Sequence, residues 1–204
     1  MEHYFEQVEG WFGFRRQYEK IIDLVPSNAV WVELGCFQGK SLSWLMVERH
    51  NRNIDLDVYA IDSWPTDEDD EEFLAQVELG YGFKNKAVGK FFDNLQPFIG
   101  QFTPIKSLSW DAAQQFKDST VDYIMIDAGH DYESVLKDMT AWWPKIKSGG
   151  YMGGDDYDLR GGDVQRAVDK FFANIGLEVE INNNFKENKG TYSKGSGNWL
   201  VKKP

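Results

Sequence analysis

The sequence predicts an α/β fold, with a doubly wound, mostly parallel sheet of seven strands that ends in a C-terminal antiparallel hairpin. The first observation lies in residues 121–157. An apolar run at 121–126, apolar side chains at helical spacing from Tyr132, and a second strand-like run before Asp155 form a strand–helix–strand unit. Such a unit joins parallel strands through a right-handed crossover. The second observation is a pair of strand-like runs, 177–181 and 198–201, which should be antiparallel because no helix separates them.

The other elements follow from hydrophobic periodicity and from breaker residues. Pro26 should end the first helix, Pro144 and the glycines at 149–150 the central helix, and Gly176 the last helix. We expect helices at 4–25, from residue 41, and at 87–96, 111–116, 132–143 and 164–175, and further strands at 29–34, 58–61 and 102–105. Residues 1–204 should form a single domain, with residues 1–26 as an N-terminal helix and residues 63–90 as a polar lid insertion.

The composition excludes several classes of protein. Hydrophobic residues make up 42% of the chain and aromatic residues 15%, which is typical of a globular domain. A formal net charge of -11 argues against a nucleic-acid partner and against an anionic membrane surface. The one cysteine, Cys36, excludes an intrachain disulfide and a cysteine-rich zinc site. Because we find no signal-peptide pattern and no apolar run of about 18 residues, we expect a cytoplasmic protein without a membrane partner.

A glycine-containing loop follows the strand at 29–34 and leads into the next helix. Strand, glycine loop and helix form the nucleotide-binding entry of a doubly wound sheet. The spacing here is E-x-G-x-x-x-G, with Glu33, Gly35 and Gly39. It is neither the G-x-G-x-x-G of dinucleotide-binding proteins nor a P-loop, which disfavours NAD and FAD. Glu33 suits a cationic or amine-bearing ligand, and an ordinary tight turn is the alternative interpretation.

Two positions further along the chain suit an adenosine-type ligand. Asp62 ends the strand at 58–61, where an acid can hold a ribose diol, although it could equally begin a polar loop. Trp110 follows the strand at 102–105 and could flank a flat base, with core packing as the alternative.

Three carboxylates come directly after two strands that should be parallel. Asp127 follows the strand at 121–126, and Asp155 and Asp156 follow the next strand, so all three should meet at the carboxyl edge of the sheet. Carboxylates crowded in this way either have raised pKa values or bind a divalent cation. His130 lies in the same loop as Asp127 and is a candidate base. The alternative is that Asp131 caps the helix while the acidic pair begins a polar loop.

These residues resemble a known family. VELGCFQGKS at 32–41 and YAIDSW at 59–64 resemble the first two motifs of class I S-adenosylmethionine-dependent methyltransferases, which have a Rossmann-like fold. The central block, residues 126–157, resembles the metal-dependent branch that includes the macrocin and mycinamicin sugar O-methyltransferases. Many relatives carry an acid two positions after the first metal-binding Asp, where this chain has Gly129. The resemblance therefore leaves His130 as the general base.

The resemblance also implies a set of site residues. The catalytic residues would be His130 and Asp127, and Mg²⁺ or a similar divalent cation would be bound by Asp127, Asp155 and Asp156. S-adenosylmethionine would be bound by Glu33, Gly35, Cys36, Phe37, Gly39, Ser41, Asp62, Ser63, Ser109, Trp110 and Asp127.

The expected reaction is methyl transfer to a hydroxyl group of a small-molecule acceptor such as a sugar, and a homo-oligomer is compatible with it. A non-catalytic domain that binds S-adenosylmethionine or adenosine and acts as an interaction module is a rival from a different class. A nicotinamide-dependent oxidoreductase is disfavoured by the absent G-x-G-x-x-G motif and by the terminal hairpin.

Overall fold

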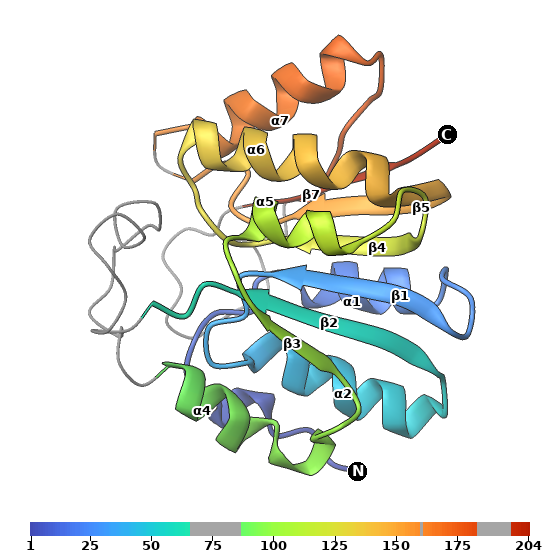
Figure 1. Cartoon of the computed structure of the whole chain (residues 1–204), viewed down its shortest axis with the longest axis vertical. Helices are drawn as coiled ribbons and strands as arrows, with labels where there is room; N and C mark the ends of the chain where they lie inside the picture. The colour runs from blue at the N-terminus through green and yellow to red at the C-terminus, as the bar shows by residue number, and fades with distance from the viewer. Residues whose placement is uncertain (66–86, 160, 183–196) are drawn as a thin grey trace.

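A computed structural model of the chain describes residues 1–65, 87–159, 161–182 and 197–204 (Figure 1). In this part of the chain one sheet has the strand order β3-β2-β1-β4-β5-β7-β6. β1 to β5 run parallel, and β7 pairs antiparallel with both β5 and β6, so the predicted fold class is confirmed. The strands are β1 Ala29–Leu34, β2 Leu56–Asp62, β3 Thr103–Lys106, β4 Val121–Ile126, β5 Ile146–Gly154, β6 Glu180–Asn182 and β7 Asn198–Lys202.

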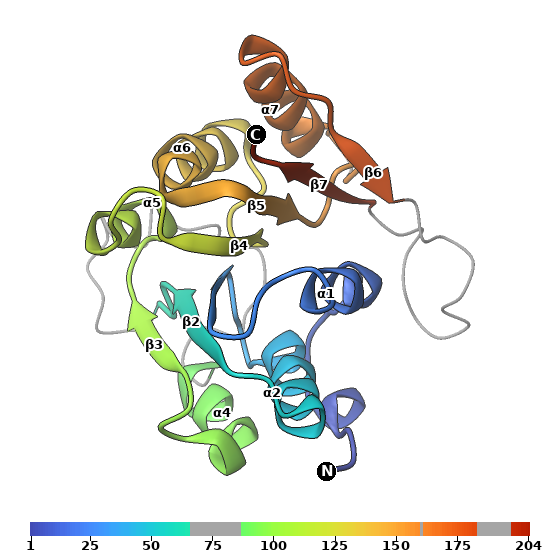
Figure 2. The ribbon, with the colours of Figure 1, turned by 90° about the vertical axis from the view of Figure 1, so that its right-hand side faces the viewer.

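Helices cover both faces of the sheet, as Figure 2 shows from the side. α1, α2 and α4 lie on one face, and α5, α6 and α7 lie on the other. The α-helices are α1 Arg15–Ile22, α2 Lys40–Arg52, α4 Ala87–Asn94, α5 Ser109–Ala112, α6 Tyr132–Trp142 and α7 Asp163–Asn174. Short 3₁₀ turns are η1 Phe5–Gln7, η2 Gln96–Phe98, η3 Ala113–Gln115 and η4 Trp143–Lys145.

Strand alternation divides the core into two layers. In β4, Tyr123 and Met125 pack with the α1–α2 layer, whereas Ile124 and Ile126 pack with the α5–α7 layer. Every residue of β4 is buried, including Asp122, which explains why its sequence is largely apolar and does not alternate. β1 is almost entirely buried as well, and both strands have the bounds that the sequence predicts.

The predicted N-terminal helix at 4–25 is wrong in its extent. The chain forms the short turn η1, then an extended segment, and becomes α-helical only over α1. Gly10 has a φ of +124°, a conformation that an α-helix does not contain. The segment between η1 and α1 instead buries Phe12 and Phe14 in the core. Apolar spacing alone did not distinguish this packed loop from a helix.

β5 also begins earlier than the sequence indicates. The glycines at 149–150 were expected to follow the central helix as its stop signal, but they lie inside β5, which starts at Ile146. Pro144 sits in the 3₁₀ turn η4, which already ends the helix. A register shift between Val121 and Tyr123 lets β5 accommodate these glycines.

A smaller correction concerns the start of α5. Ser109 and Trp110 begin α5, although a loop was expected there. Most of the expected lid insertion at 63–90 lies outside the described residues.

Among the described residues, no helix has both the length and the apolar character needed to cross a membrane.

Candidate functional site

The candidate site lies at the carboxyl ends of β1 and β4, where the strand order reverses. From β1 the chain proceeds outward through β2 and β3, whereas β4 and β5 extend on the other side (Figure 1). Open α/β sheets bind ligands at such a switch point. The loops are joined across it by backbone hydrogen bonds from Gly35 N to Ile61 O (2.9 Å) and from Asp127 N to Leu34 O (2.9 Å).

Both glycines of the first loop are required by its geometry. Gly35 has a φ of +84°, and an added Cβ would lie 1.8 Å from the carbonyl oxygen of Asp127. Gly39 has a φ of +81° and precedes α2, where an added Cβ would lie 3.1 Å from the side chains of Phe91 and Leu95. The loop is thus pressed against the β4 loop on one side and against α4 on the other. This close packing goes beyond an ordinary tight turn.

Asp62 is bound to the glycine loop by backbone hydrogen bonds. Its Oδ2 accepts from the N–H groups of Cys36 and Phe37, both at 2.8 Å, and its Oδ1 accepts from Trp64 N at 2.7 Å. Burial raises the pKa of Asp62, and these backbone donors oppose the rise. Ser63 lies beside it and is partly exposed. The structure therefore brings the ends of β1 and β2 together as the sequence predicts.

Glu33 is enclosed in the core beneath this loop. Its side chain is fully buried and accepts hydrogen bonds from the Tyr18 hydroxyl at 2.6 Å and from the Ser41 hydroxyl at 2.5 Å. Burial raises the pKa of Glu33 to about 7, although the two hydroxyl donors oppose this effect. Glu33 and Ser41 thus interact with each other, and Glu33 is not exposed at the surface of the loop. Cys36 is also buried.

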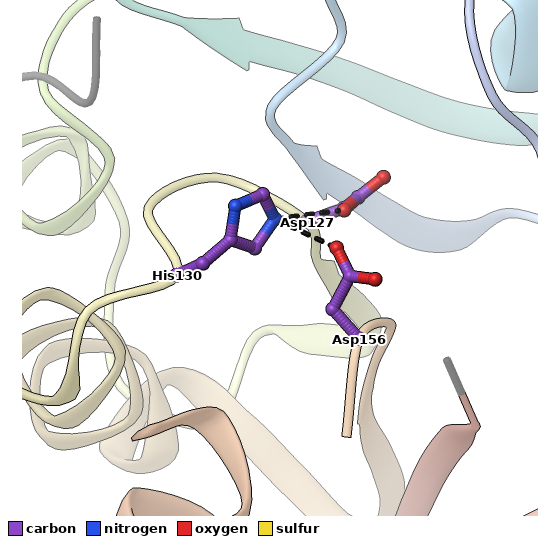
Figure 3. A group of neighbouring side chains, drawn as sticks. All are labelled: Asp127, His130 and Asp156. Carbon is purple, nitrogen blue, oxygen red and sulfur yellow. Dashed lines mark ion pairs between the residues drawn. The ribbon is translucent and has the colours of Figure 1, made fainter. Parts of the chain in front are cut away.

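Asp127, His130 and Asp156 converge on the other side of the switch point (Figure 3). The Nε2 atom of His130 lies 2.9 Å from Oδ2 of Asp156 and 3.7 Å from Oδ1 of Asp127. One ligand atom from each residue lies within 4.8 Å of the other two. Asp127 follows β4, His130 lies in the loop before α6, and Asp156 follows β5, so the meeting of parallel strand ends creates the cluster.

Asp155 lies near this cluster but points to a different partner. Its Oδ1 accepts a hydrogen bond from Nδ2 of Asn198 at 2.6 Å, and Asn198 begins β7. Asp156 has a φ of +59°, so the backbone turns between the two acids and separates their side chains. Of the three carboxylates predicted to hold a metal, Asp127 and Asp156 are therefore in the cluster, and Asp155 is beside it.

The pKa values in the cluster rise as expected for crowded carboxylates. Burial raises the pKa of Asp127 to about 6; hydrogen bonding from His130 lowers it, and the charge of Asp156 raises it. Burial also raises the pKa of Asp155 well above its usual value, and the charges of Asp127 and Asp156 add to this rise. Carboxylates that lie this close together fit a divalent cation, because carboxylate oxygens suit hard cations such as Mg²⁺.

Ser109 and Trp110 stand at the end of β3, at the start of α5. Ser109 is buried, whereas the ring of Trp110 is partly exposed and has the ammonium group of Lys137 4.9 Å from its centroid. Trp110 is thus only partly buried, and part of its surface remains accessible to a ligand. Asp131 does cap α6, accepting from Ser134 N at 3.0 Å, as the alternative interpretation proposed.

Sequence reasoning missed several supporting residues. Trp64 donates from its indole N–H to the Phe37 carbonyl oxygen at 2.8 Å and so holds the glycine loop. Tyr18 and Asn198 supply the partners of Glu33 and Asp155. The loop geometry also explains why position 129 is a glycine, because an added Cβ would lie 2.8 Å from Cβ of Ser134. The sequence gives no local signal for these contacts, since each joins distant segments or depends on loop geometry.

Comparisons with known proteins agree with this geometry. A family model described as "Methyltransferase domain" matches residues 32–157. The uncharacterized protein R132 of Acanthamoeba polyphaga mimivirus is 29% identical over 155 residues, which cover 72% of this chain and 61% of that protein. The chain therefore spans about three-fifths of the length of this relative.

Two solved structures are similar in fold. The O-methyltransferase NovP has a TM-score of 0.63 and 21% identity, covering 98% of this chain and 79% of that chain. SMU.1697c from Streptococcus mutans, solved in complex with SAH, has a TM-score of 0.63 and 13% identity, covering 96% of this chain and 100% of that chain. At these identities the likeness shows the fold and does not identify an acceptor.

Proposed function

The chain belongs to the methyltransferase domain family, and from that premise we propose that it is a divalent-metal-assisted O-methyltransferase acting on a sugar or another small molecule that carries a hydroxyl group. S-adenosylmethionine is the methyl donor of the enzyme. The observation that carries the finer proposal is the convergence of Asp127, His130 and Asp156 beside the glycine loop, with His130 Nε2 only 2.9 Å from Asp156.

The cofactor half of the site would be formed by the ends of β1, β2 and β3. Gly35 and Gly39 set the close packing of the loop against the β4 loop and α4, and Asp62 lies at the end of β2, where an acid can hold a ribose diol. Phe37 and Ser63 lie beside Asp62. In this arrangement the glycine loop would hold the methionine part of the cofactor, and Ser109 and Trp110 would hold the base. Glu33, Cys36 and Ser41 would support the loop from below.

The acceptor half would be the cluster at the ends of β4 and β5. Asp127 and Asp156 would hold a divalent cation, with Asp155 beside them, and the bound cation would lower the pKa of the acceptor hydroxyl and orient it. His130 would take the hydroxyl proton on Nε2. The oxygen then forms a bond to the methyl carbon as the sulfur–methyl bond breaks, and the sulfonium becomes a neutral thioether.

A small, uncharged or cationic acceptor fits this half best. The cluster and its neighbour Asp155 are acidic, and the whole chain carries a formal net charge of -11. An anionic acceptor such as nucleic acid would be repelled by this charge. A neutral ring that carries adjacent hydroxyl groups satisfies both the charge and the need for a chelating oxygen pair.

The test is methyl transfer from labelled S-adenosylmethionine to a panel of methyl glycosides and catechol, with Mg²⁺ or Mn²⁺ and then with EDTA. We expect turnover that EDTA abolishes. His130→Gln should reduce kcat by about 100-fold or more, which is the usual range for loss of a general base. Asp156→Asn should also reduce kcat strongly, because it removes a ligand of the cation. Calorimetry should show that both variants bind S-adenosylmethionine within about threefold of wild type, because neither residue belongs to the cofactor half.

Asp118→Asn is the matched control, because Asp118 is a carboxylate paired with Lys145 at the opposite edge of the sheet. This variant should retain full turnover. Turnover that resists EDTA would contradict the metal role. Cofactor binding with no methyl transfer to any acceptor would support the non-catalytic binding module instead.

A further inference from the structure

Asp138 is a buried carboxylate that the proposed reaction does not use. It lies on the inner face of α6, and its side chain has no exposed surface. Within the described part of the chain, neither of its oxygens makes a hydrogen bond of ordinary geometry. Buried polar groups are almost always hydrogen-bonded, so a carboxylate in this state calls for a specific reason.

The surroundings of Asp138 favour its neutral form. Burial raises the pKa of Asp138 to about 7; the neighbouring hydroxyl group of Ser109 opposes the rise, the charge of Asp131 adds to it, and the charge of Lys137 opposes it. A protonated carboxyl group both donates and accepts, and so does the hydroxyl group of Ser109. The two side chains are therefore matched partners across the interface between α5 and α6.

Two more contacts join the same elements. Nε1 of Trp142, one turn further along α6, donates to the carbonyl oxygen of Ser109 at 2.9 Å. Nζ of Lys137 lies 4.9 Å from the ring centroid of Trp110. Three residues of α6 thus lie near Ser109 and Trp110, the first two residues of α5. Figure 1 shows α5 beside α6. An α-helix of four residues does not keep its position by itself, so α6 must hold it.

The start of α5 is close to the place expected for the base of the cofactor. In the parallel pairing of β2 with β3, Asp62 is level with Lys106, and Ser107 N donates to Asp62 O at 3.0 Å. Ser109 and Trp110 follow two and three residues after Ser107 on the same carboxyl edge. A nucleoside whose ribose is held by Asp62 therefore directs its base toward them.

We propose that Asp138 is a positioning residue for cofactor binding, which acts through Ser109 to hold the start of α5, with the ring of Trp110, against the base of S-adenosylmethionine. Because α6 begins directly after the loop of His130, one helix then fixes both the base-binding wall and the acid cluster. The inference rests on the cofactor half of the proposed site and is independent of the metal and the acceptor.

Calorimetric titration of S-adenosylhomocysteine in the presence of EDTA tests it. Asp138→Leu and Ser109→Ala should each weaken binding about tenfold, because each removes one of the two polar groups that face each other between α5 and α6. Asp138→Asn should stay within about threefold of wild type, because an amide also donates and accepts. The double variant Asp138→Leu/Ser109→Ala should bind no worse than the weaker single variant, since both changes break one interaction.

Base preference gives a readout that a purely structural role would not move. Wild type should bind S-adenosylhomocysteine more tightly than its inosine analogue, S-inosylhomocysteine, and Asp138→Leu should reduce this ratio. Asp122→Asn is the matched control, because Asp122 is a buried carboxylate on β4 that is paired with Lys147. It should lower thermal stability without changing either the affinity or the ratio.

The proposal would be overturned if Asp138→Leu and Ser109→Ala both kept wild-type affinity and base preference. If Asp138→Leu does not fold, Ser109→Ala and Asp138→Asn carry the same test. Absence of S-adenosylhomocysteine binding by folded wild type would refute this inference together with the cofactor site. Intact binding and base preference without methyl transfer to any acceptor would refute the proposed O-methylation alone.

Discussion

Both halves of the carboxyl edge carry carboxylates, but the carboxylates of the two halves have different partners. In the half built by β1 and β2, Asp62 accepts three backbone hydrogen bonds of 2.7 to 2.8 Å from the chain itself. In the half built by β4 and β5, Asp127 and Asp156 lie beside each other and His130. The carboxylate of the first half is thus held by backbone donors, whereas the second half concentrates negative charge.

This difference indicates a division of labour. A carboxylate that is already held by backbone donors is rigid, and rigid groups bind a cofactor at low entropic cost. Carboxylates that raise one another's pKa values are held in an unfavourable arrangement, which a cation or a proton relieves. We therefore expect the first half to respond to mutation through stability and cofactor affinity, and the second half through turnover.

The two halves touch at Gly35, and breaking this contact should have the largest effect on stability. In Gly35→Ala the new Cβ would meet the Asp127 carbonyl oxygen at 1.8 Å, and φ would remain at +84°. The two loops would have to separate, at a cost above about 4 kcal/mol in the free energy of unfolding. Urea denaturation measures this cost.

Gly176→Ala is the matched control for Gly35→Ala. Gly176 has a φ of +72°, but nothing lies within 4 Å of an added Cβ. It should cost only about 1 kcal/mol, from the backbone conformation alone. Equal losses in the two variants would show that the contact between the halves is not rigid.

Glu33 provides the next largest effect, as a dependence on pH. Because burial raises its pKa to about 7 in the folded chain, folding stability should fall as pH rises from about 4.5 to 7, by up to about 3 kcal/mol. Above pH 7 this contribution should be constant. In Glu33→Gln this part of the fall should disappear, so that the variant gains on wild type between about pH 4.5 and pH 7.

Urea denaturation at several pH values would measure this difference. Glu178→Gln, at an exposed position, controls for the loss of a carboxylate as such and should parallel wild type. Parallel curves for Glu33→Gln and wild type would contradict the view that Glu33 changes its protonation state in the core.

Asp62→Asn tests how much the backbone hydrogen bonds to Asp62 contribute to the first half. The amide offers one acceptor oxygen where the carboxylate offers two, so some of the backbone donors of Cys36, Phe37 and Trp64 would lose their partner. We expect a loss of about 2 kcal/mol in unfolding free energy and weaker binding of S-adenosylmethionine. Asp57→Asn, at an exposed position of the same strand, should change stability by less than about 0.5 kcal/mol. If Asp62→Asn left stability and cofactor binding unchanged, the hydrogen bond from the Trp64 indole, and not Asp62, would be what holds the glycine loop in place.

The predictable parts of this site come from strands, and the unpredictable parts come from long-range partners. The apolar runs of β1 and β4 gave their bounds, and parallel strand ends must meet, so Asp62, Asp127 and Asp156 were placed correctly at one edge. The orientation of Asp155 was not predictable, because its partner Asn198 lies 43 residues away in the sequence. The hydrogen bond from Tyr18 to the buried Glu33 was not predictable either, because the sequence pattern identifies Tyr18 only as an apolar position of a helix.

The smallest effect should come from the helix cap in the second half. Asp131 accepts from Ser134 N at the start of α6, directly after His130. Asp131→Ala should lower the free energy of unfolding by about 1 kcal/mol, whereas Asp131→Asn, which still caps a helix well, should lose only a few tenths. Although burial by itself raises the pKa of Asp131, hydrogen bonding from Ser134 lowers it overall, so this contribution is present at neutral pH and is lost as the solution is acidified. Urea denaturation at pH 7 and pH 3 would show the loss in Asp131→Ala shrinking at the lower pH. If Asp131→Ala also reduced turnover as strongly as His130→Gln, the cap of α6, and not only the end of β4, would set the position of the histidine.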